Sequence, residues 1–260
     1  MTEKTFAELK DTARKVRRLT LKAIFDAKSG HPSGSLSCID ILTYLYSKVL
    51  TSGDKFILSK GHACPAWYAT LAKMGEIPEE ELSTLRKLDS RLQGHPSPQL
   101  PQVVTPTGSL GQGFAVACGI ALGYKHLKSP SKVYVLLGDG ELQEGIVWES
   151  ARIAGVAALG NLNAIIDYNG FSSDDRVLGL EPLADKWRAF GWHVLQVDGH
   201  NFGELEYTFN VFKKGSIKPQ VIIARTVKGK GISYMEGRPE WHGSLVLSRK
   251  ELNTALAELN

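Results

Sequence analysis

Two stretches decide the fold: VYVLLGDGELQEG, residues 133–145, and AIIDYNG, residues 164–170. Each begins with an apolar run that predicts a buried strand, Val133–Leu137 and Ala164–Ile166, and ends in a polar loop with glycine. Between them, Leu142–Ala158 has apolar residues at helical spacing and enough length for a crossover helix. We therefore predict a right-handed βαβ unit whose two loops meet at the carboxyl edge of neighbouring parallel strands.

Asp139 and Asn169 follow these two predicted strands directly. Neighbouring strands lie about 4.8 Å apart, so the two side chains can share one ligand. A carboxylate and an amide oxygen suit a hard cation such as Mg²⁺, with Ca²⁺ or Mn²⁺ as substitutes, that also carries phosphate. Gly138 and Gly140 would let the backbone approach a diphosphate closely. The alternative is a strand-to-helix turn in which Asp139 is only a helix N-cap.

The rest of the chain alternates strands and helices, which predicts one α/β domain over residues 1–260 with a mostly parallel sheet covered by helices on both faces. Further strands are expected at Phe56–Leu58, Trp192–Val197 and Gln220–Ala224. Helices are expected at Phe6–Ala27, Cys38–Val49, Ala63–Lys73, Pro78–Lys87, Phe114–His126, Leu183–Phe190, Phe202–Lys213 and Ser248–Leu259. The pattern predicts a turn at Ser29–Ser35 and irregular chain at Arg91–Pro106 and Val227–Trp241.

Composition excludes several classes of protein. With 43% hydrophobic and 22% charged residues and a net charge of +4, the chain is typical of a globular protein. The densest basic stretch, Lys15–Arg18, has no interleaved aromatics, so we expect no nucleic-acid binding. The charged start and the lack of an apolar run near ~20 residues predict neither a signal peptide nor a membrane span. Cys38, Cys64 and Cys118 are odd in number and lack CxxC spacing, which indicates the reducing cytoplasm.

Four of the seven histidines stand in loops flanked by glycine or proline. His31 and His95 are each in Gly-His-Pro, His62 is in Ser-Lys-Gly-His, and His242 is in Trp-His-Gly. Zinc is the rival interpretation, but the close pairing of zinc ligands is absent. The glycine-rich TGSLGQG, residues 107–113, lacks the dinucleotide-fingerprint spacing; the alternative to a functional role for it is a close-packed turn before a helix.

These motifs together resemble those of the transketolase family, specifically its N-terminal, diphosphate-binding half. They occur in the family's order and span residues 30–244: GHPSG, SKGHA, QGHPS, TGSLGQG, GDGELQEG, DYNGFS and WHGS. The resemblance implies a thiamine-diphosphate-binding fold, with thiamine diphosphate and Mg²⁺ as cofactors and sugar phosphates as substrates. It also implies transfer of a two-carbon ketol unit from a ketose phosphate to an aldose phosphate.

The resemblance further assigns roles to individual residues. It implies that Asp139, Asn169 and the backbone carbonyl of Phe171 hold the metal. Cofactor contacts are implied for His62, Gly108, Leu110, Gly111, Gly113, Asp139, Gly140, Glu144, Asn169 and His242. Catalytic roles are implied for His31, His95, His242 and Glu144, with His31 and His95 facing the sugar hydroxyls and helping to move protons. Glu144 is expected in the first turn of the crossover helix, either as a favourable charge worth ~0.3–1 kcal/mol or as an interface group coupled to the neighbouring active site.

Transketolases normally carry a pyrimidine-binding domain and a C-terminal domain in the same chain, and this sequence ends at Asn260 without them. We therefore expect half an active site, completed by a C-terminal subunit in an α₂β₂ assembly; a fragment of a longer chain is the rival interpretation. Two other functions stay open. One is a subunit of another thiamine diphosphate enzyme, such as a 2-oxoacid dehydrogenase or a deoxyxylulose-phosphate synthase, and the other is a non-catalytic cofactor-binding subunit.

Overall fold

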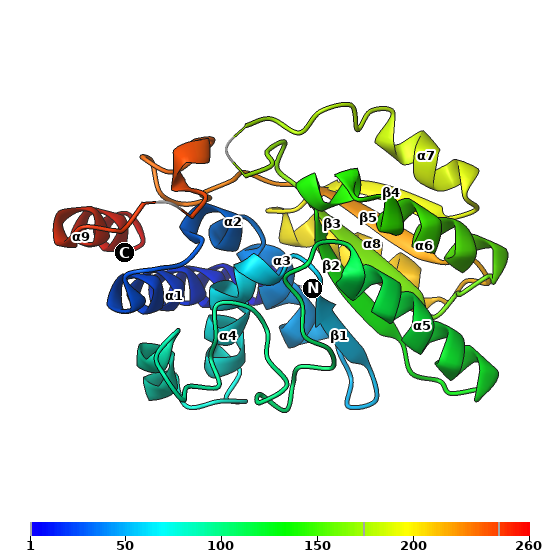
Figure 1. Ribbon diagram of the computed structural model, residues 1–260, viewed down its shortest axis with the longest axis horizontal. Coiled ribbons are helices and arrows are strands. Elements are labelled where there is room, and N and C mark those ends of the chain that lie inside the picture. Colours follow the sequence, from blue (N-terminus) through cyan, green and yellow to red (C-terminus); the bar gives the residue numbers. More distant parts are fainter. Residues whose placement is uncertain (1, 174, 244) are drawn as a thin grey trace.

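The two predicted strands and the crossover between them form the centre of the fold. In the computed structural model, which describes residues 2–173, 175–243 and 245–260 (Figure 1), β2 (Val133–Gly138) and β3 (Leu162–Tyr168) pair in parallel. Helix α6 (Gly145–Val156) connects them. The register sets Gly138 opposite Asp167, so the loops that follow leave the same edge of the sheet. The predicted βαβ unit is confirmed.

The sheet has five strands in the order β1-β2-β3-β5-β4, and every pairing is parallel. The outer strands are β1 (Lys55–Leu58) and β4 (His193–Asp198), and β5 (Gln220–Arg225) lies between β3 and β4. Parallel strands need crossover connections, and the helices that make them cover both faces of the sheet. The predicted fold class is confirmed.

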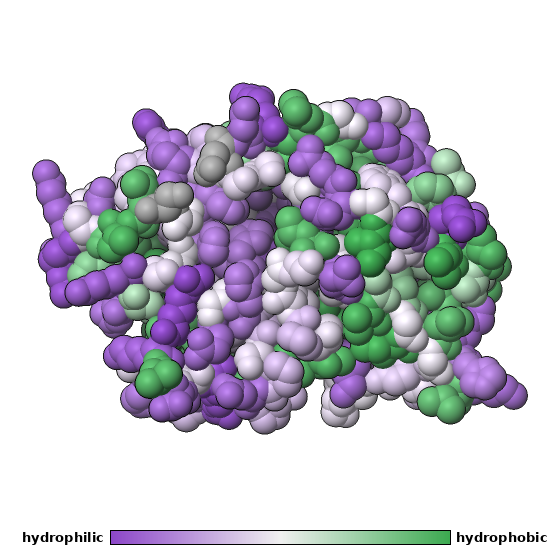
Figure 2. Space-filling model, in the orientation of Figure 1, coloured by the Kyte–Doolittle hydropathy of each residue, from purple (hydrophilic) through white to green (hydrophobic). Residues whose placement is uncertain are grey.

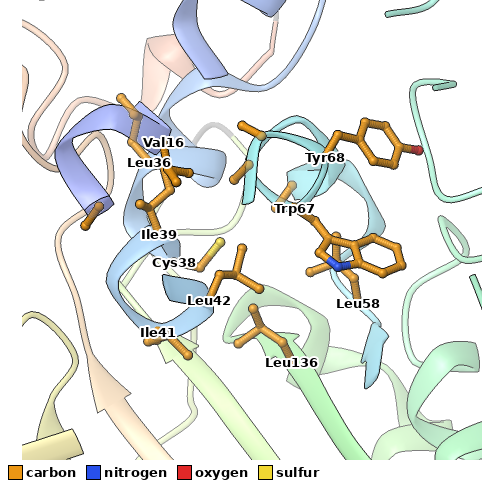
Figure 3. Packing of buried hydrophobic residues seen from close by; sticks show 14 of the residues in the cluster. Val16, Leu36, Cys38, Ile39, Ile41, Leu42, Leu58, Trp67, Tyr68 and Leu136 are labelled. Atoms are coloured by element: carbon orange, nitrogen blue, oxygen red, sulfur yellow. The ribbon is translucent and has the colours of Figure 1, made fainter. Parts of the chain in front are cut away.

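Residues of β2 alternate between two hydrophobic clusters, one on each face of the sheet. Tyr134 and Leu136 belong to the larger cluster, whereas Val133, Val135 and Leu137 belong to the other. Figure 3 shows the larger cluster, where Leu136 lies near Leu42 and Trp67. Its helices include α1 (Glu3–Ala27), α3 (Ile39–Tyr44), α4 (Cys64–Lys73) and α8 (Phe202–Lys213). The opposite face is covered by α5 (Gln112–His126), α6 and α7 (Leu183–Ala189).

Three local predictions were wrong. The stretch predicted as a turn contains a helix, α2 (Pro32–Ser37), because Pro32 stands at its first position, where proline is favourable. The helix predicted at Pro78–Lys87 is a short 3₁₀ turn, Glu79–Thr84. The crossover helix begins at Gly145 rather than Leu142, since Gly140–Gln143 forms a separate 3₁₀ turn.

The remaining elements follow the prediction closely. The second predicted helix is α3 continued by a π-helical turn, Leu45–Val49. A short 3₁₀ turn, Gly61–Ala63, precedes α4, and another, Pro239–Trp241, interrupts the irregular chain after β5. The last helix, α9 (Arg249–Glu258), starts with a capping box between Ser248 and Glu251. In the described ranges, no helix has the length and apolar character needed to span a bilayer.

Candidate functional site

The buried carboxylate of Asp139 joins the loops that follow β2 and β3. Its Oδ2 accepts a hydrogen bond from the Gly170 N–H at 2.5 Å, and its Oδ1 accepts one from the Gly140 N–H at 2.9 Å. In the second loop, Asn169 Oδ1 accepts a hydrogen bond from the Phe171 N–H at 3.1 Å. The residues predicted to hold a metal therefore lie together at one edge of the sheet.

The chemistry of these donors fits a divalent cation. Burial, and after it the neighbouring Asp167, raise the pKa of Asp139 to about 6, although Lys60 and the N–H groups of Gly170 and Gly140 act in the opposite direction. A nearby cation would favour the ionised carboxylate. Magnesium takes oxygen ligands such as a carboxylate, a side-chain amide oxygen and a main-chain carbonyl. Within the described ranges, no three His, Cys, Asp or Glu side chains are grouped to hold a metal, so a cation here would need Asn169 and a carbonyl.

A cavity of about 110 Å³ opens beside this edge. Figure 2 shows hydrophilic residues around a hollow in the upper middle of the face, between the positions of α2 and the end of β2 in Figure 1. Two lysines and two histidines line the cavity together with the Asp139 loop. The lining residues are Gly34, Lys60, His62, Leu110, Gly138, Asp139, Gly140, Glu141, Asn169, Phe171, Ser172, Ser173, Lys228 and His242. Cations and N–H donors around a small cavity fit the diphosphate of a cofactor.

Lys60 is held in the cavity wall by an ion pair with Asp167, and both side chains are almost fully buried. The Lys60 ammonium also donates to the carbonyl oxygen of Gly34 at 3.0 Å. Asp167 accepts further hydrogen bonds from Ser37 Oγ, at 2.5 Å, and from Thr226 Oγ1. Burial alone would lower the pKa of Lys60, but Asp167 outweighs it and the pKa is raised. Lys60 is therefore a fixed positive charge at neutral pH.

Glu141 ties the glycine-rich TGSLGQG loop to the end of β2. The carboxylate is 2% exposed and accepts hydrogen bonds from the backbone N–H groups of Gly111 at 2.8 Å and Gly138 at 3.1 Å, and from Ser59 Oγ. Gly111 has a φ of +81°, and a Cβ there would lie 2.4 Å from Ile146 Cγ2. This glycine is therefore required by the backbone and by packing.

The four loop histidines converge on one another. The centroid of the His31 ring lies 5.3 Å from that of His62, 5.2 Å from that of His242 and 6.5 Å from that of His95. The rings of His62 and His242 are 5.2 Å apart. The Nδ1 atoms of His31 and His242 are buried and have no hydrogen-bond partner among the described residues. Orphaned polar atoms beside a cavity are expected where a polar ligand binds.

All four histidines are electrically neutral near pH 7. Burial is the main cause that lowers the pKa of His31 to about 4 and that of His242 to about 3; the next cause is Arg86 for His31 and Lys228 for His242. Burial likewise lowers the pKa of His62 well below its usual value. The more exposed His95 has its pKa lowered by partial burial and then by Arg86. A neutral imidazole offers one donor and one acceptor, so each ring can pass a proton.

The residues predicted to bind the cofactor or metal, or to act in catalysis, divide into two groups. Those that line the cavity are His62, Leu110, Asp139, Gly140, Asn169, Phe171 and His242. The lining found among the described residues excludes His31, His95, Gly108, Gly111, Gly113 and Glu144. Gly108 instead packs on His95, since a Cβ at Gly108 would lie 3.0 Å from His95 Cδ2.

One placement was wrong. Glu144 does not lie in the first turn of α6, because it is the exposed N-cap residue with extended backbone, φ −75° and ψ 128°. Its N–H donates to the carbonyl of Glu141, at 3.1 Å, in the preceding 3₁₀ turn. Ser244, the last residue of the predicted WHGS motif, lies outside the described residues.

Four charged residues of the site were not predicted from the sequence. Lys60, Glu141 and Asp167 lie inside quoted motifs, but no role was predicted for them. Lys228 lay in a stretch predicted only as irregular. It is 2% exposed, and its ammonium donates to the carbonyl oxygens of Ser172 at 2.7 Å and Ser173 at 3.0 Å. Charged residues inside otherwise glycine-rich motifs are the signal that could have found three of the four.

Comparisons with known proteins give the same assignment over nearly the whole chain. Residues 9–258 match the family model described as transketolase, thiamine diphosphate binding domain. The chain is 39% identical to a subunit of apulose-4-phosphate transketolase from Phocaeicola vulgatus, over 88% of this chain and 86% of that protein. It is 40% identical to a subunit of 6-deoxy-6-sulfo-D-fructose transketolase from a Clostridium species, over 97% of this chain and 96% of that protein.

Solved structures agree with these sequence matches. Transketolase from Campylobacter jejuni superimposes with a TM-score of 0.91 at 31% identity, covering 100% of this chain and 43% of the solved chain. The chain therefore spans about two fifths of the length of that transketolase. On this evidence, the chain belongs to the transketolase family, as its thiamine diphosphate binding domain.

Proposed function

We propose that this chain is the cofactor-binding subunit of a transketolase that transfers a two-carbon ketol unit from a ketose phosphate to an aldose phosphate. The observation that carries the proposal is the cavity at the ends of β2 and β3, where Asp139 and Asn169 lie beside two buried lysines and two neutral histidines. When bound there, thiamine diphosphate would supply the carbanion chemistry of ketol transfer.

The proposed metal ligands are Asp139, Asn169 and the main-chain carbonyl of Phe171, with Mg²⁺ as the ion. The raised pKa of Asp139 supports this assignment, because a cation would compensate a carboxylate that burial disfavours. Lys60 and Lys228 would neutralise the diphosphate, and His62 and His242 would donate hydrogen bonds to it.

His31 and His95 are proposed to act on the sugar. Their rings lie 6.5 Å apart, and His31 is in ring contact with both His62 and His242. Because His31 is neutral with a buried, unpartnered Nδ1, it can accept a proton from a sugar hydroxyl or return one. His95, the more exposed of the two, would contact the part of the sugar farther from the diphosphate.

The partner is proposed to be a second polypeptide with the pyrimidine-binding domain, in an α₂β₂ assembly. Two relatives named as transketolase subunits match this chain over 86% and 96% of their own length.

An apolar surface supports a protein partner. Val116 and Leu122 of α5 and Ile153 and Val156 of α6 are exposed, and Figure 2 shows hydrophobic residues gathered on the right of the face, over these helices. Glu144 is proposed to lie in the same interface. Three free, buried cysteines support a cytoplasmic location.

A pull-down from the source cells with Mg²⁺ and thiamine diphosphate, followed by assay of the purified complex, tests this function. The donors would include a common ketose phosphate, apulose 4-phosphate and 6-deoxy-6-sulfofructose, each with an aldose phosphate acceptor. We expect a stoichiometric partner with a pyrimidine-binding domain and ketol transfer from at least one donor. Turnover of pyruvate without any ketose would instead indicate another class of thiamine diphosphate enzyme. Cofactor binding without any turnover would indicate a non-catalytic subunit.

A further inference from the structure

A buried charge network lies between α1, α3 and the end of β4. The Arg17 guanidinium donates two hydrogen bonds to Asp40, from Nη1 to Oδ1 at 3.0 Å and from Nη2 to Oδ2 at 2.6 Å. His200 Nδ1 lies 2.6 Å from the same Oδ2. The side chains of Arg17 and Asp40 are 8% exposed, and that of His200 is 12% exposed. Arg17, from the densest basic stretch of the sequence, is therefore inside the protein.

The tautomer of His200 follows from its two contacts. Nε2 accepts a hydrogen bond from the Val227 N–H at 2.9 Å, so it carries no proton, and Nδ1 must then donate to Asp40. Burial alone would raise the pKa of Asp40, but Arg17 and His200 lower it to about 2. Asp40 is therefore an ionised anchor for both partners.

His200 and Arg17, the two partners of Asp40, both hydrogen-bond to one short segment of the chain, residues 227–230. His200 holds the Val227 N–H, and Arg17 Nε donates to the Lys230 carbonyl at 3.1 Å. Between these two points, the Gly229 N–H donates to the carbonyl of Ser33, next to the cavity residue Gly34, at 2.9 Å. The segment is thus fixed on both sides of Lys228, which is the residue that enters the cavity wall.

We propose that His200 and Arg17, which both hydrogen-bond to Asp40, are positioning residues that fix residues 227–230 and so hold the Lys228 ammonium in the anion-binding cavity. This inference rests on the proposed function, in which Lys228 faces a diphosphate. The cavity lining found among the described residues includes none of the three network residues, so their effect on binding must pass through the segment that they hold.

Two substitutions at His200 separate positioning from simple support. In His200→Asn, the amide nitrogen matches Nδ1 and keeps the bond to Asp40, but nothing remains to accept from Val227. In His200→Gln, the amide oxygen matches Nε2 and keeps the acceptor for Val227, whereas the bond to Asp40 is lost. If the network has only a structural role, each variant should lose affinity for thiamine diphosphate in proportion to its loss of unfolding free energy. If the network positions Lys228, affinity should fall only in the variant that loses the hydrogen bond to the Val227 N–H.

The experiment measures the dissociation constant of thiamine diphosphate with saturating Mg²⁺, by calorimetry on the full chain, together with urea unfolding of each variant. We expect His200→Asn to bind about three- to tenfold more weakly, the effect of one buried hydrogen bond, and His200→Gln to bind within about twofold of wild type. Lys228→Met should weaken binding about tenfold or more, since it removes a charged contact. Adding His200→Asn to Lys228→Met should then have no further effect, because the two changes act on one path.

Different outcomes would overturn the positioning role and the proposed function. If His200→Asn binds as tightly as wild type, or if it still weakens binding several-fold in the Lys228→Met background, the positioning role is overturned while the proposed function stands. If binding by both His200 variants simply follows their loss of unfolding free energy, the network is only structural. If neither the wild-type chain nor its complex with the partner binds thiamine diphosphate with Mg²⁺ at any concentration tested, the proposed function itself is overturned, and the positioning role with it.

Discussion

Asp167→Asn should lower the unfolding free energy, because it removes the carboxylate of the Lys60–Asp167 ion pair in the cavity wall. The substitution preserves the size of the side chain and its capacity to accept from Ser37, but it leaves the ammonium of Lys60 without its partner carboxylate. Lys60 is 1% exposed and Asp167 is 0% exposed, so water cannot replace the lost charge. Removing one partner of a buried pair costs about 3–5 kcal/mol. Because Asp139 also acts electrostatically on Lys60, we expect the lower end, about 3 kcal/mol of unfolding free energy.

The assay is urea unfolding of wild type, Asp167→Asn, Lys60→Met and the double variant at pH 7, followed by circular dichroism. Each single variant leaves an unpaired buried group, whereas the double variant leaves no buried ammonium. We therefore expect the double variant to be more stable than the sum of the single losses predicts, by about 2 kcal/mol. An Asp167→Asn loss below about 1 kcal/mol, or strictly additive losses, would refute the argument that the two groups are coupled in a dry interior.

Three further outcomes follow from the same structure. Gly111→Ala should lower the unfolding free energy by about 1–3 kcal/mol, because its φ of +81° and the approach to Ile146 both oppose a Cβ, while Gly119→Ala on α5 should not. The native pKa values of His31 and His242 lie below the value near 6.5 of unfolded histidine, so the unfolded state binds more protons as the pH falls. The unfolding free energy should therefore decline by about 1–2 kcal/mol between pH 7 and pH 5, a value reduced because both side chains are partly exposed. Urea unfolding of a His242→Asn variant at the same two pH values should show a smaller decline. Ile153→Asp on α6 should leave the unfolding curve of the chain unchanged and abolish assembly with the partner in size-exclusion chromatography; unimpaired assembly would move the interface elsewhere.

The fold was predictable because its signals are local. Short apolar runs such as Val133–Leu137, which is followed by glycine, favour buried strands, and the length of the segments between the runs favours a parallel sheet. The wrong predictions of helix boundaries occur where one or a few residues override the local sequence pattern. Pro32 begins a helix inside a sequence rich in Ser and Gly that otherwise indicates a turn, and the 3₁₀ turn after Gly140 delays α6, which moves Glu144 out of the helix.

The site was predictable only in part. Asp139 and Asn169 could be paired because each follows a predicted strand, and the register of a βαβ unit brings such positions together. Lys60 and Asp167 are 107 positions apart, and Arg17 and Lys230 are 213 apart, so no local pattern links them. Contacts of this kind depend on how layers pack, which a single sequence does not encode in its periodicity. The family resemblance could locate the histidines, but the shared cluster that they form required the structure.

The Mg²⁺ dependence of thiamine diphosphate binding tests whether the edge formed by β2 and β3 holds a metal and a diphosphate. Calorimetry on the wild-type chain, with and without Mg²⁺, would be compared with Asp139→Ala and with Glu240→Ala as an exposed control. We expect the wild type and the control to bind thiamine diphosphate only when Mg²⁺ is present, and Asp139→Ala to show no Mg²⁺-dependent binding. Equal binding by Asp139→Ala and wild type would contradict this expectation.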